Sequence, residues 1–519
     1  MAVELEPSPI EEEEEEDQDE PAYRDGPAHH PFAPLDELFN ISTTVDPSYI
    51  ISLIRKLLPI KVTSKDASLI DASDAPNQGS SVDDTAGCAV SLSRDRVMHS
   101  SISKNMEIVD DSRESASVER VSNESSQGVE KSDHNVSVGE QAWEEYGCVL
   151  WDLAASKTHA ELMVENLVLE VLLANLMVSQ STRATEIILG ILGNLACHEV
   201  PMQRIISTNE LIELIVNQLF LDDAQCLCEA CRLLTLGLQS SESLAWASAL
   251  QSEHTLSRIL WIAENSLNLQ LIEKSVELLL AITESSQEVV HILLSPLMNL
   301  GLPSLLINLL DFEISNIVTE RIPERLSILD VILRVIETLS VIDNHSPQIS
   351  SNKELFQLVC KLVTLPDKAE VANSSVTAVV LIANILSDVA DLASEISYDL
   401  TFLQGLLDIF PFASDDLEAR SALWNIMARL LIHVHESEMS MSGLHQYVSV
   451  LASKADLIED DLLDRQLDGL KAKARITALR RIISILNHWT ASKNDVTSNH
   501  HVNDDGVGRL LDCCSKHLE

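Results

Sequence analysis

A helical pattern that returns at a nearly constant interval is the feature that most constrains this chain. Between residues 141 and 489 the sequence reads as helix after helix, and several helices place aliphatic residues three and four apart before small or polar residues. Examples are "VLWDLAAS", "GILGNLACHE", "LTLGLQSSE", "LLLAITESS", "VIETLSVID", "LIANILSDV" and "LWNIMARLL". Their aligned positions are Leu153, Leu195, Leu238, Ile282, Leu339, Ile385 and Ile426. Five of the six intervals are 41 to 46 residues, which indicates stacked helical repeats.

The segments between these helices predict the layout of one repeat. Residues 201–238, "PMQRIISTNELIELIVNQLFLDDAQCLCEACRLLTLGL", read as a short helix, a second helix, an Asp-Asp turn and a long helix. Residues 392–431 repeat this order. The layout is typical of armadillo units, so we predict an all-α, armadillo/HEAT-like right-handed α-solenoid of about seven units over 139–491. The remaining interval, of 57 residues, spans 311–327, which we expect to be an insertion on one face.

The stretch "EIILGILGNLACHE" contains the residue types of three kinds of site. Its glycines are compatible with a phosphate-binding loop, and its cysteine and histidine with a metal corner or a nucleophile. It lacks the GxxxxGK[ST] pattern of phosphate loops. We therefore interpret it as the third helix of a repeat. Gly190 and Gly193 would let neighbouring helices approach closely, each at a cost of about 1 kcal/mol in helix propensity.

Four further segments flank or precede the repeats. The like charges of residues 1–30 favour a disordered acidic tail. Residues 31–61 predict a short helix, about 47–58, that caps the exposed apolar end of the first repeat. Residues 62–138 are rich in Ser, Asp and Glu, and their apolar residues are too sparse to offset the entropy of ordering, so we expect a disordered linker. Residues 492–519 are expected to be a C-terminal tail.

The charge balance of the chain limits the classes of partner that it can bind. The formal net charge is −46, with 81 acidic and 35 basic residues. Nucleic-acid binding is disfavoured, because Lys and Arg must neutralise phosphates, whereas basic proteins are compatible partners. The N-terminus lacks the pattern of a secretory signal, and no uninterrupted apolar run reaches 18 residues. We expect a soluble intracellular protein with no membrane contact, located in the nucleus, the cytoplasm or both.

Two clusters contain residue types that bind metals or catalyse reactions. Cys226, Cys228 and Cys231 have C-x-C-x-x-C spacing, but on one predicted helix Cys226 and Cys228 point apart, and buried free cysteine is a common core residue. His433 and His435 in "LIHVHESE" also point apart, at a predicted helix end. No nucleophile elbow occurs. We predict no enzymatic activity, no catalytic residue, no cofactor and no metal site.

A partial ladder of asparagines gives the candidate binding residues. Asn194, Asn384 and Asn425 each directly precede an aligned aliphatic position. In armadillo proteins of similar layout, third-helix asparagines line a concave groove and bond the backbone of an extended peptide, since an amide both donates and accepts. The alternative is that these amides satisfy backbone groups of neighbouring repeats. The sequence leaves both interpretations open.

The same alignment disfavours a nuclear-import receptor. Those receptors pair each groove asparagine with a tryptophan four residues earlier. Here those positions are Gly190, Val380 and Ser421, and Trp424 is predicted on a different helix face. The shelf for lysine stems is therefore missing.

Basic residues gather near the C-terminus in "LDGLKAKARITALRRIISILNHW". They are Lys471, Lys473, Arg475, Arg480 and Arg481. They are compatible with a nuclear signal or a contact for acidic partners. The preceding "DLIEDDLLDRQLD" offers carboxylates, so we favour a charge-paired capping helix pair.

Four segments resemble one known family. The segments "VLWDLA", "EIILGILGNLACHE" and "EACRLLTLGLQ" are similar to the serum-amyloid-A-like (SAAL) family, an armadillo-type group, as is "HPFAPLDELFNIS" near the N-terminus. The resemblance is good over 139–290 and looser to about 490. It implies a non-enzymatic, nuclear repeat protein linked to control of cell proliferation. It supplies no catalytic or established binding residues.

These observations favour an interaction protein. We expect an adaptor or scaffold that binds a peptide or helix of another protein in its concave groove. The alternative is an acidic carrier or chaperone for basic proteins, suggested by charge alone.

Overall fold

The structure is a computed structural model that describes residues 45–59, 133–319, 322–463, 472–493 and 504–518. Within these ranges the secondary structure is entirely helical, and no strand occurs in them. The acidic tail expected at 1–30 and nearly all of the expected linker lie outside the described residues.

Most helices fall into three recurring classes. The first helices are α4 (Lys157–Glu165), α7 (Glu199–Ser207), α10 (Ser243–Leu250), α13 (Gln287–Asn299), α16 (Ser346–Ser350), α19 (Leu392–Ile396) and α22 (Met441–Ser453). The second helices are α5 (Val168–Val178), α8 (Leu211–Asn217), α11 (Glu253–Asn265), α14 (Leu302–Thr319), α17 (Lys353–Val363), α20 (Leu400–Leu407) and α23 (Ala455–Leu463). The third helices are α6 (Thr182–Ala196), α9 (Ala224–Gln239), α12 (Leu269–Thr283), α15 (Pro323–Val341), α18 (Ala372–Asp388), α21 (Leu417–His433) and α24 (Ala472–Lys493). Short 3-10 helices η1 (Gln218–Phe220) and η2 (Phe410–Ala413) follow α8 and α20.

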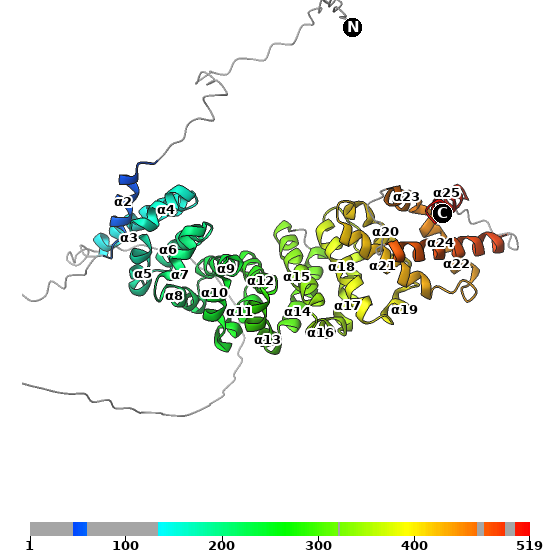
Figure 1. The fold of residues 1–519 in the computed structure, drawn as a ribbon, viewed down its shortest axis with the longest axis horizontal. Helices are drawn as coiled ribbons and strands as arrows, with labels where there is room; N and C mark the ends of the chain where they lie inside the picture. The colour runs from blue at the N-terminus through cyan, green and yellow to red at the C-terminus, as the bar shows by residue number, and fades with distance from the viewer. Residues whose placement is uncertain (1–44, 60–132, 320–321, 464–471, 494–503, 519) are drawn as a thin grey trace, which may run out of the picture.

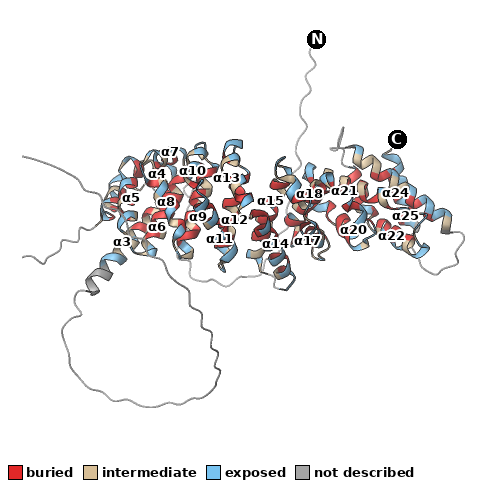
Figure 2. Cartoon of the chain, turned by 90° about the horizontal axis from the view of Figure 1, so that it is seen from below, coloured by how far each residue is buried: buried red, intermediate tan, exposed pale blue. Residues whose placement is uncertain are grey.

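The third helices form one continuous ladder. An additional long helix, α3 (Asp133–Ala154), packs against α6, and each third helix then packs against the next, as far as α24. Figure 1 shows the resulting elongated stack, and in Figure 2 buried residues run along its length. The prediction of an all-α solenoid of armadillo type is confirmed.

Local signals explain where the helices begin. Ser181, Asp223, Asn268 and Asp416 each accept a hydrogen bond from a backbone N–H in the first turn of a third helix, as N-cap residues do. The chain also reverses tightly between first and second helices. Leu167 and Glu210 have φ of 64° and 65° there, and Gly301, at 102°, occupies the same place before α14. Because different residue types occupy this positive-φ position, the sequence pattern did not predict the turn.

The 57-residue interval between the fourth and fifth aligned positions, Ile282 and Leu339, has a local origin. It is occupied by an 18-residue α14 and a 19-residue α15, so the extra residues lengthen helices on both sides of 320–321. Glu313, which is fully buried, accepts two hydrogen bonds of 3.0 Å from Nη1 of Arg325. An ion pair thus links the two lengthened helices.

The N-terminal helix α2 (Pro47–Lys56) packs against α3 and α4. Asp46 accepts a hydrogen bond from the Ser48 backbone N–H, and Pro47 fits the first turn because its missing N–H would have no partner there. Its fully buried C-terminal neighbour Leu57 presents a carbonyl that accepts hydrogen bonds from Trp143 Nε1 (3.3 Å) and Asn175 Nδ2 (2.7 Å). Helix α2 therefore covers the start of the repeat stack.

The C-terminal region differs from the expectation in two ways. Helix α24, expected in a capping pair, is instead a full member of the ladder against α21. The segment 492–519, expected to be a tail, contains α25 (Asp504–Lys516), which packs on α22, α23 and α24. Its apolar residues explain this packing, since Val507, Leu510, Cys513 and Cys514 are buried.

Helix α14 alone, among the described helices, is long and apolar enough to cross a membrane by length and composition. It is a packed helix of the solenoid, because Leu306, Leu310 and Ile314 are fully buried and it contacts α11, α13, α15 and α17.

Candidate functional site

Polar side chains connect successive third helices along the ladder. Hydrogen bonds or ion pairs join Arg232 to Asn194, Ser327 to Glu273, Arg334 to Glu284, Ser374 to Asp330, Asn384 to Ser340 and Arg429 to Ser387. We call these residues, together with Asn425, Lys473 and Arg480, the third-helix surface. All three predicted binding residues, Asn194, Asn384 and Asn425, belong to it.

Asn194, on α6, is held by both neighbouring helices. Its Nδ2 donates to the backbone oxygen of Trp151 on α3 at 2.9 Å, and its Oδ1 accepts from Arg232 Nη2 on α9 at 3.2 Å. The same Arg232 nitrogen donates to the Gly190 carbonyl at 3.3 Å. Asn194 is therefore an inter-repeat link, as the alternative interpretation expects.

Asn384 and Asn425 are less fully engaged. Asn384 Nδ2 donates to Ser340 Oγ on the preceding third helix at 3.0 Å. Asn425 Nδ2 donates to the backbone oxygen of Ser421, one turn earlier on its own helix, at 2.8 Å. Neither Oδ1 has a hydrogen-bond partner within the described ranges, and both residues are only partly buried. Each keeps its acceptor oxygen for a ligand, and Asn384 also keeps one amide hydrogen, whereas Asn425 Nδ2 has a second, 3.4 Å contact with Ser421 Oγ.

The two glycines of "GILGNLA" are packing positions. A Cβ added to Gly190 would lie 2.1 Å from carbons of the Trp151 ring, and one added to Gly193 would lie 2.4 Å from Arg232 Nη2. Both glycines lie inside α6, so their backbone N–H groups are used by the helix rather than displayed as in a phosphate loop. Close helix approach is the role that the sequence predicted for them.

The three cysteines of the C-x-C-x-x-C cluster are buried core residues. Cys226, Cys228 and Cys231 are buried on α9, and burial raises the pKa of each thiol to about 12. A metal requires the thiolate, which this environment disfavours. The described residues contain no group of three or more His, Cys, Asp or Glu side chains placed to hold a metal ion.

The "LIHVHESE" segment and Trp424 also serve structural contacts. Glu436 pairs with Arg481 at 3.0 Å, and Tyr398 Oη donates to the His433 carbonyl while accepting from the His435 N–H. Trp424 is 1% exposed and donates its Nε1 to Asp461, so it does not reach the third-helix surface.

The middle of the third-helix surface holds carboxylates that the sequence analysis missed. Burial raises the pKa of Asp330, and burial followed by the nearby carboxylate of Glu418 raises the pKa of Glu337. Arg334 pairs with Glu284 at 2.8 Å beside them. A signal existed in the sequence, since Asp330, Arg334 and Glu337 recur at helical spacing on α15.

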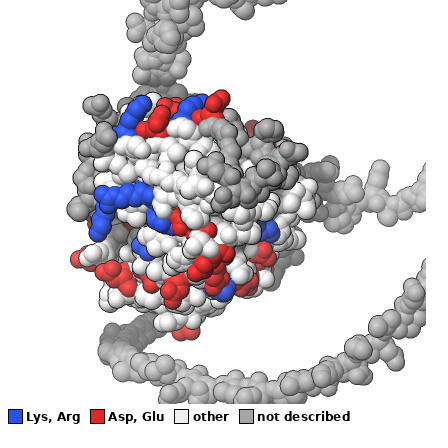
Figure 3. Space-filling model, turned by 90° about the vertical axis from the view of Figure 1, so that its right-hand side faces the viewer, with Lys and Arg blue, Asp and Glu red and all other residues white. Residues whose placement is uncertain are grey.

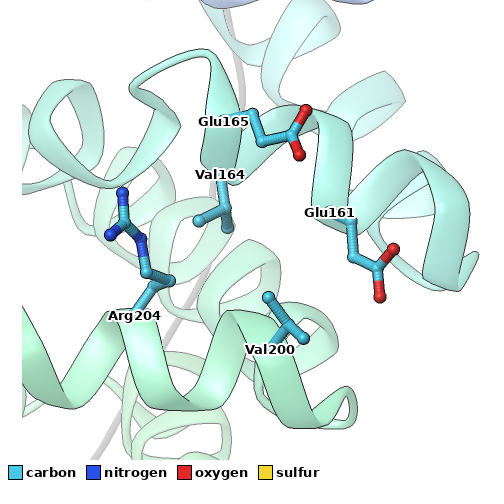
Figure 4. A pocket seen from close by; sticks show the side chains of 5 residues that line it. All are labelled: Glu161, Val164, Glu165, Val200 and Arg204. Atoms are coloured by element: carbon cyan, nitrogen blue, oxygen red, sulfur yellow. The ribbon is translucent and has the colours of Figure 1, made fainter.

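A separate cavity of about 450 Å³ lies between α4 and α7. Figure 4 shows Val164 and Val200 facing the gap from opposite helices, with Glu161 and Glu165 on α4 and Arg204 on α7. These are first helices, so the cavity is distinct from the third-helix surface. Its few polar groups do not converge on one point.

Comparison with known proteins gives one distant relative. No family model matches the chain. "Protein saal1" of Danio rerio is 24% identical over 350 residues, covering 64% of this chain and 71% of that protein.

Several solved structures also align with part of the chain. The designed armadillo repeat protein YIII(Dq)4CqI is 14% identical over 47% of this chain and 94% of its own, with a TM-score of 0.38. The designed armadillo repeat protein YIII(Dq.V1)4CPAF, solved with peptide (KR)4, is 16% identical over 47% and 94%, with a TM-score of 0.39. The engineered protein OR497 is 15% identical over 73% and 95%, also at 0.39. The chain is thus similar in sequence to Protein saal1 over 64% of its length.

Proposed function

We propose that this protein is a non-enzymatic adaptor that binds a peptide or helix of another protein along its third-helix surface. The observation that supports this most is the series of polar contacts on that surface, which join α6 to α9, α12 to α15, α15 to α18 and α18 to α21. A rigid row of helices presents side chains at regular spacing, which suits an extended ligand. We also propose that the chain is a member of the SAAL family and that it acts in the nucleus in the control of proliferation.

Asn384 and Asn425 are the residues best placed to bind a peptide backbone. Asn384 has an amide hydrogen and an acceptor oxygen without a partner in the described part of the chain, so a peptide N–H and C=O would add bonds there without breaking existing ones. Asn425 offers its Oδ1 in the same way, and its Nδ2 would exchange only the 3.4 Å contact with Ser421 Oγ. Asn194 would have to exchange the contact of its Oδ1 with Arg232. We therefore assign Asn194 mainly to the link between repeats and the other two to the ligand.

The test is a pull-down from cell extract with the full chain as bait. The double variant Asn384→Ala/Asn425→Ala should lose partners that wild type retains. The control is Asn265→Ala on α11, an exposed asparagine whose Nδ2 bonds one turn back to the Trp261 carbonyl, as that of Asn425 does to Ser421. Identical partners on all three baits would remove the asparagines from the binding role.

The acidic carrier remains the second candidate, and the net charge of −46 is the observation that favours it. Electrostatic attraction between exposed charges is screened by salt, with a Debye length of about 8 Å at physiological ionic strength. A carrier should release its partners steeply as salt rises from 0.1 to 0.5 M. A groove-bound peptide held by amide contacts should remain bound over that range.

A further inference from the structure

Helix α24 stands out from the rest of this acidic chain. Its sequence, "AKARITALRRIISILNHWTASK", contains no Asp or Glu, although the whole chain has 81 acidic and 35 basic residues. Lys473 and Arg480 are seven residues apart, about two helical turns, so they lie on one face. Both are exposed, and Arg475 between them is half-buried.

Three of the six carboxylates that the sequence offered to these residues pair with other cations, and Asp464 and Asp468 lie outside the described residues. Asp461 of α23 bonds Arg420 of α21 at 2.7 Å, and Arg509 of α25 pairs with Asp456 and Glu459. The expected pairing of α23 with α24 is therefore wrong for these three acids. Within the described ranges, Lys473, Arg475 and Arg480 have no ion-pair partner.

The register between α21 and α24 extends this basic area. Arg481 donates to the backbone oxygens of Leu431 at 3.0 Å and Val434 at 2.6 Å, which places Arg480 beside the C-terminal half of α21. Arg429 lies on that half of α21 and donates only to Ser387 Oγ at 3.3 Å among its described contacts. We call Arg429, Lys473, Arg475 and Arg480 the C-terminal basic face. Figure 3, which views this end of the solenoid, shows Lys and Arg side chains gathered in a stripe beside acidic side chains.

We propose that the C-terminal basic face binds the chain's own acidic segment, residues 11–20. That segment, "EEEEEEDQDE", has nine carboxylates in ten residues, the highest density of negative charge in the sequence. A run of successive carboxylates suits a row of lysine and arginine, because the long basic side chains can each find a carboxylate without one fixed geometry. The proposal stands independently of the role of the asparagines.

The tether is long enough for this contact. The 24 residues between Glu20 and Val45 span at most about 80 Å when extended. Seven steps between adjacent helices, from α3 to α24, cover about 56–70 Å at 8–10 Å each. The segment therefore reaches the C-terminal basic face with a nearly extended tether.

The test measures binding of a labelled synthetic peptide of residues 11–20 by fluorescence anisotropy. One full-length variant has its tail neutralised by changing Glu11, Glu12, Glu13, Glu14, Glu15 and Glu16 to Gln. It should bind the peptide several-fold more tightly than wild type, because its own tail no longer competes. Adding Lys473→Gln/Arg480→Gln to it should weaken binding about three- to thirtyfold, as expected for two exposed charge contacts.

The control is Lys157→Gln/Lys361→Gln in the same background. Both lysines are exposed, on α4 and α17, and this pair removes the same charge. Equal loss from both pairs would overturn the basic face as the site. If wild type and the tail-neutralised chain bind the labelled peptide equally, the chain's own tail does not occupy the C-terminal basic face. That result would overturn the proposal and leave an acidic partner protein as the occupant. Wild type and the tail-neutralised chain could also differ in peptide binding only at high protein concentration. That result would mean that the acidic segment of a second copy occupies the C-terminal basic face, and it would overturn the proposal.

Discussion

Trp151 of α3 is held by two residues one turn apart on α6. Its ring lies over Gly190, where an added Cβ would come within 2.1 Å of ring carbons, and its backbone oxygen accepts a hydrogen bond of 2.9 Å from Asn194. The contact between α3 and the first of the third helices, α6, is therefore fixed by a glycine that admits the indole and an amide that holds the backbone. This relationship leads directly to a prediction.

Gly190→Ala should destabilise the protein although alanine is the better helix former. The indole fills the space of the new methyl group, so overpacking should outweigh the gain in propensity, at a net cost of about 1–3 kcal/mol. Chemical denaturation of the full chain measures this. Gly139→Ala on α3 is the matched control, because nothing lies within 4 Å of its added Cβ, and it should be neutral or stabilising by up to about 1 kcal/mol. Equal stability of the two variants would contradict the packing role.

The repeat architecture was predictable because each third helix has the same surroundings. The aliphatic positions near Leu195 and Leu238 face the same kinds of neighbours, so one pattern recurs. The partners of polar side chains are set by the register between helices, which the interval alone does not define. Asn194 bonds to both neighbouring helices while Asn425 bonds within its own, although the two occupy aligned positions.

The buried pair of Arg420 and Asp461 should be essential for the last repeats. Asp461 accepts 2.7 and 2.8 Å hydrogen bonds from Arg420 Nε and Trp424 Nε1, and the two charged side chains are 1% and 5% exposed. Asp461→Ala would remove the carboxylate that pairs with the buried Arg420 guanidinium, so we expect a loss of about 3–5 kcal/mol in unfolding free energy.

The matching control for this pair is Glu395→Ala. It removes a 2.8 Å ion pair with Lys353 whose side chains are 47% and 58% exposed, so it should cost less than about 1 kcal/mol. A similar cost for the two variants in urea denaturation would show that burial does not set the value of the Arg420 pair.

Asn175→Ala should release helix α2 from the repeat stack. Asn175 is 7% exposed, and its Nδ2 donates to the carbonyl of Leu57 at the end of α2. Loss of this donor should cost about 1–2 kcal/mol, equivalent to hydrogen exchange in α2 that is about five- to thirtyfold faster. Asn166→Ala, which removes a bond within one first helix, to the Leu162 carbonyl, should leave exchange in α2 unchanged. Unaltered α2 protection in Asn175→Ala would mean that apolar packing and the Trp143 hydrogen bond hold the cap without Asn175.

The buried cysteines of α9 predict how stability changes in alkali. Burial raises the pKa of Cys231 from its ordinary value of 9.0 to about 12. Above pH 9 the unfolded chain loses this proton while the folded chain keeps it, so the contribution of the thiol to stability falls as pH rises. At pH 10 the loss is about 1.4 kcal/mol for one thiol. Wild type should therefore lose about that much more than Cys231→Ser between pH 7 and pH 10 in urea denaturation. Between pH 7 and pH 8, where neither state ionises this thiol appreciably, the two curves should run in parallel. Parallel curves up to pH 10 would mean that the folded protein lets water reach this cysteine.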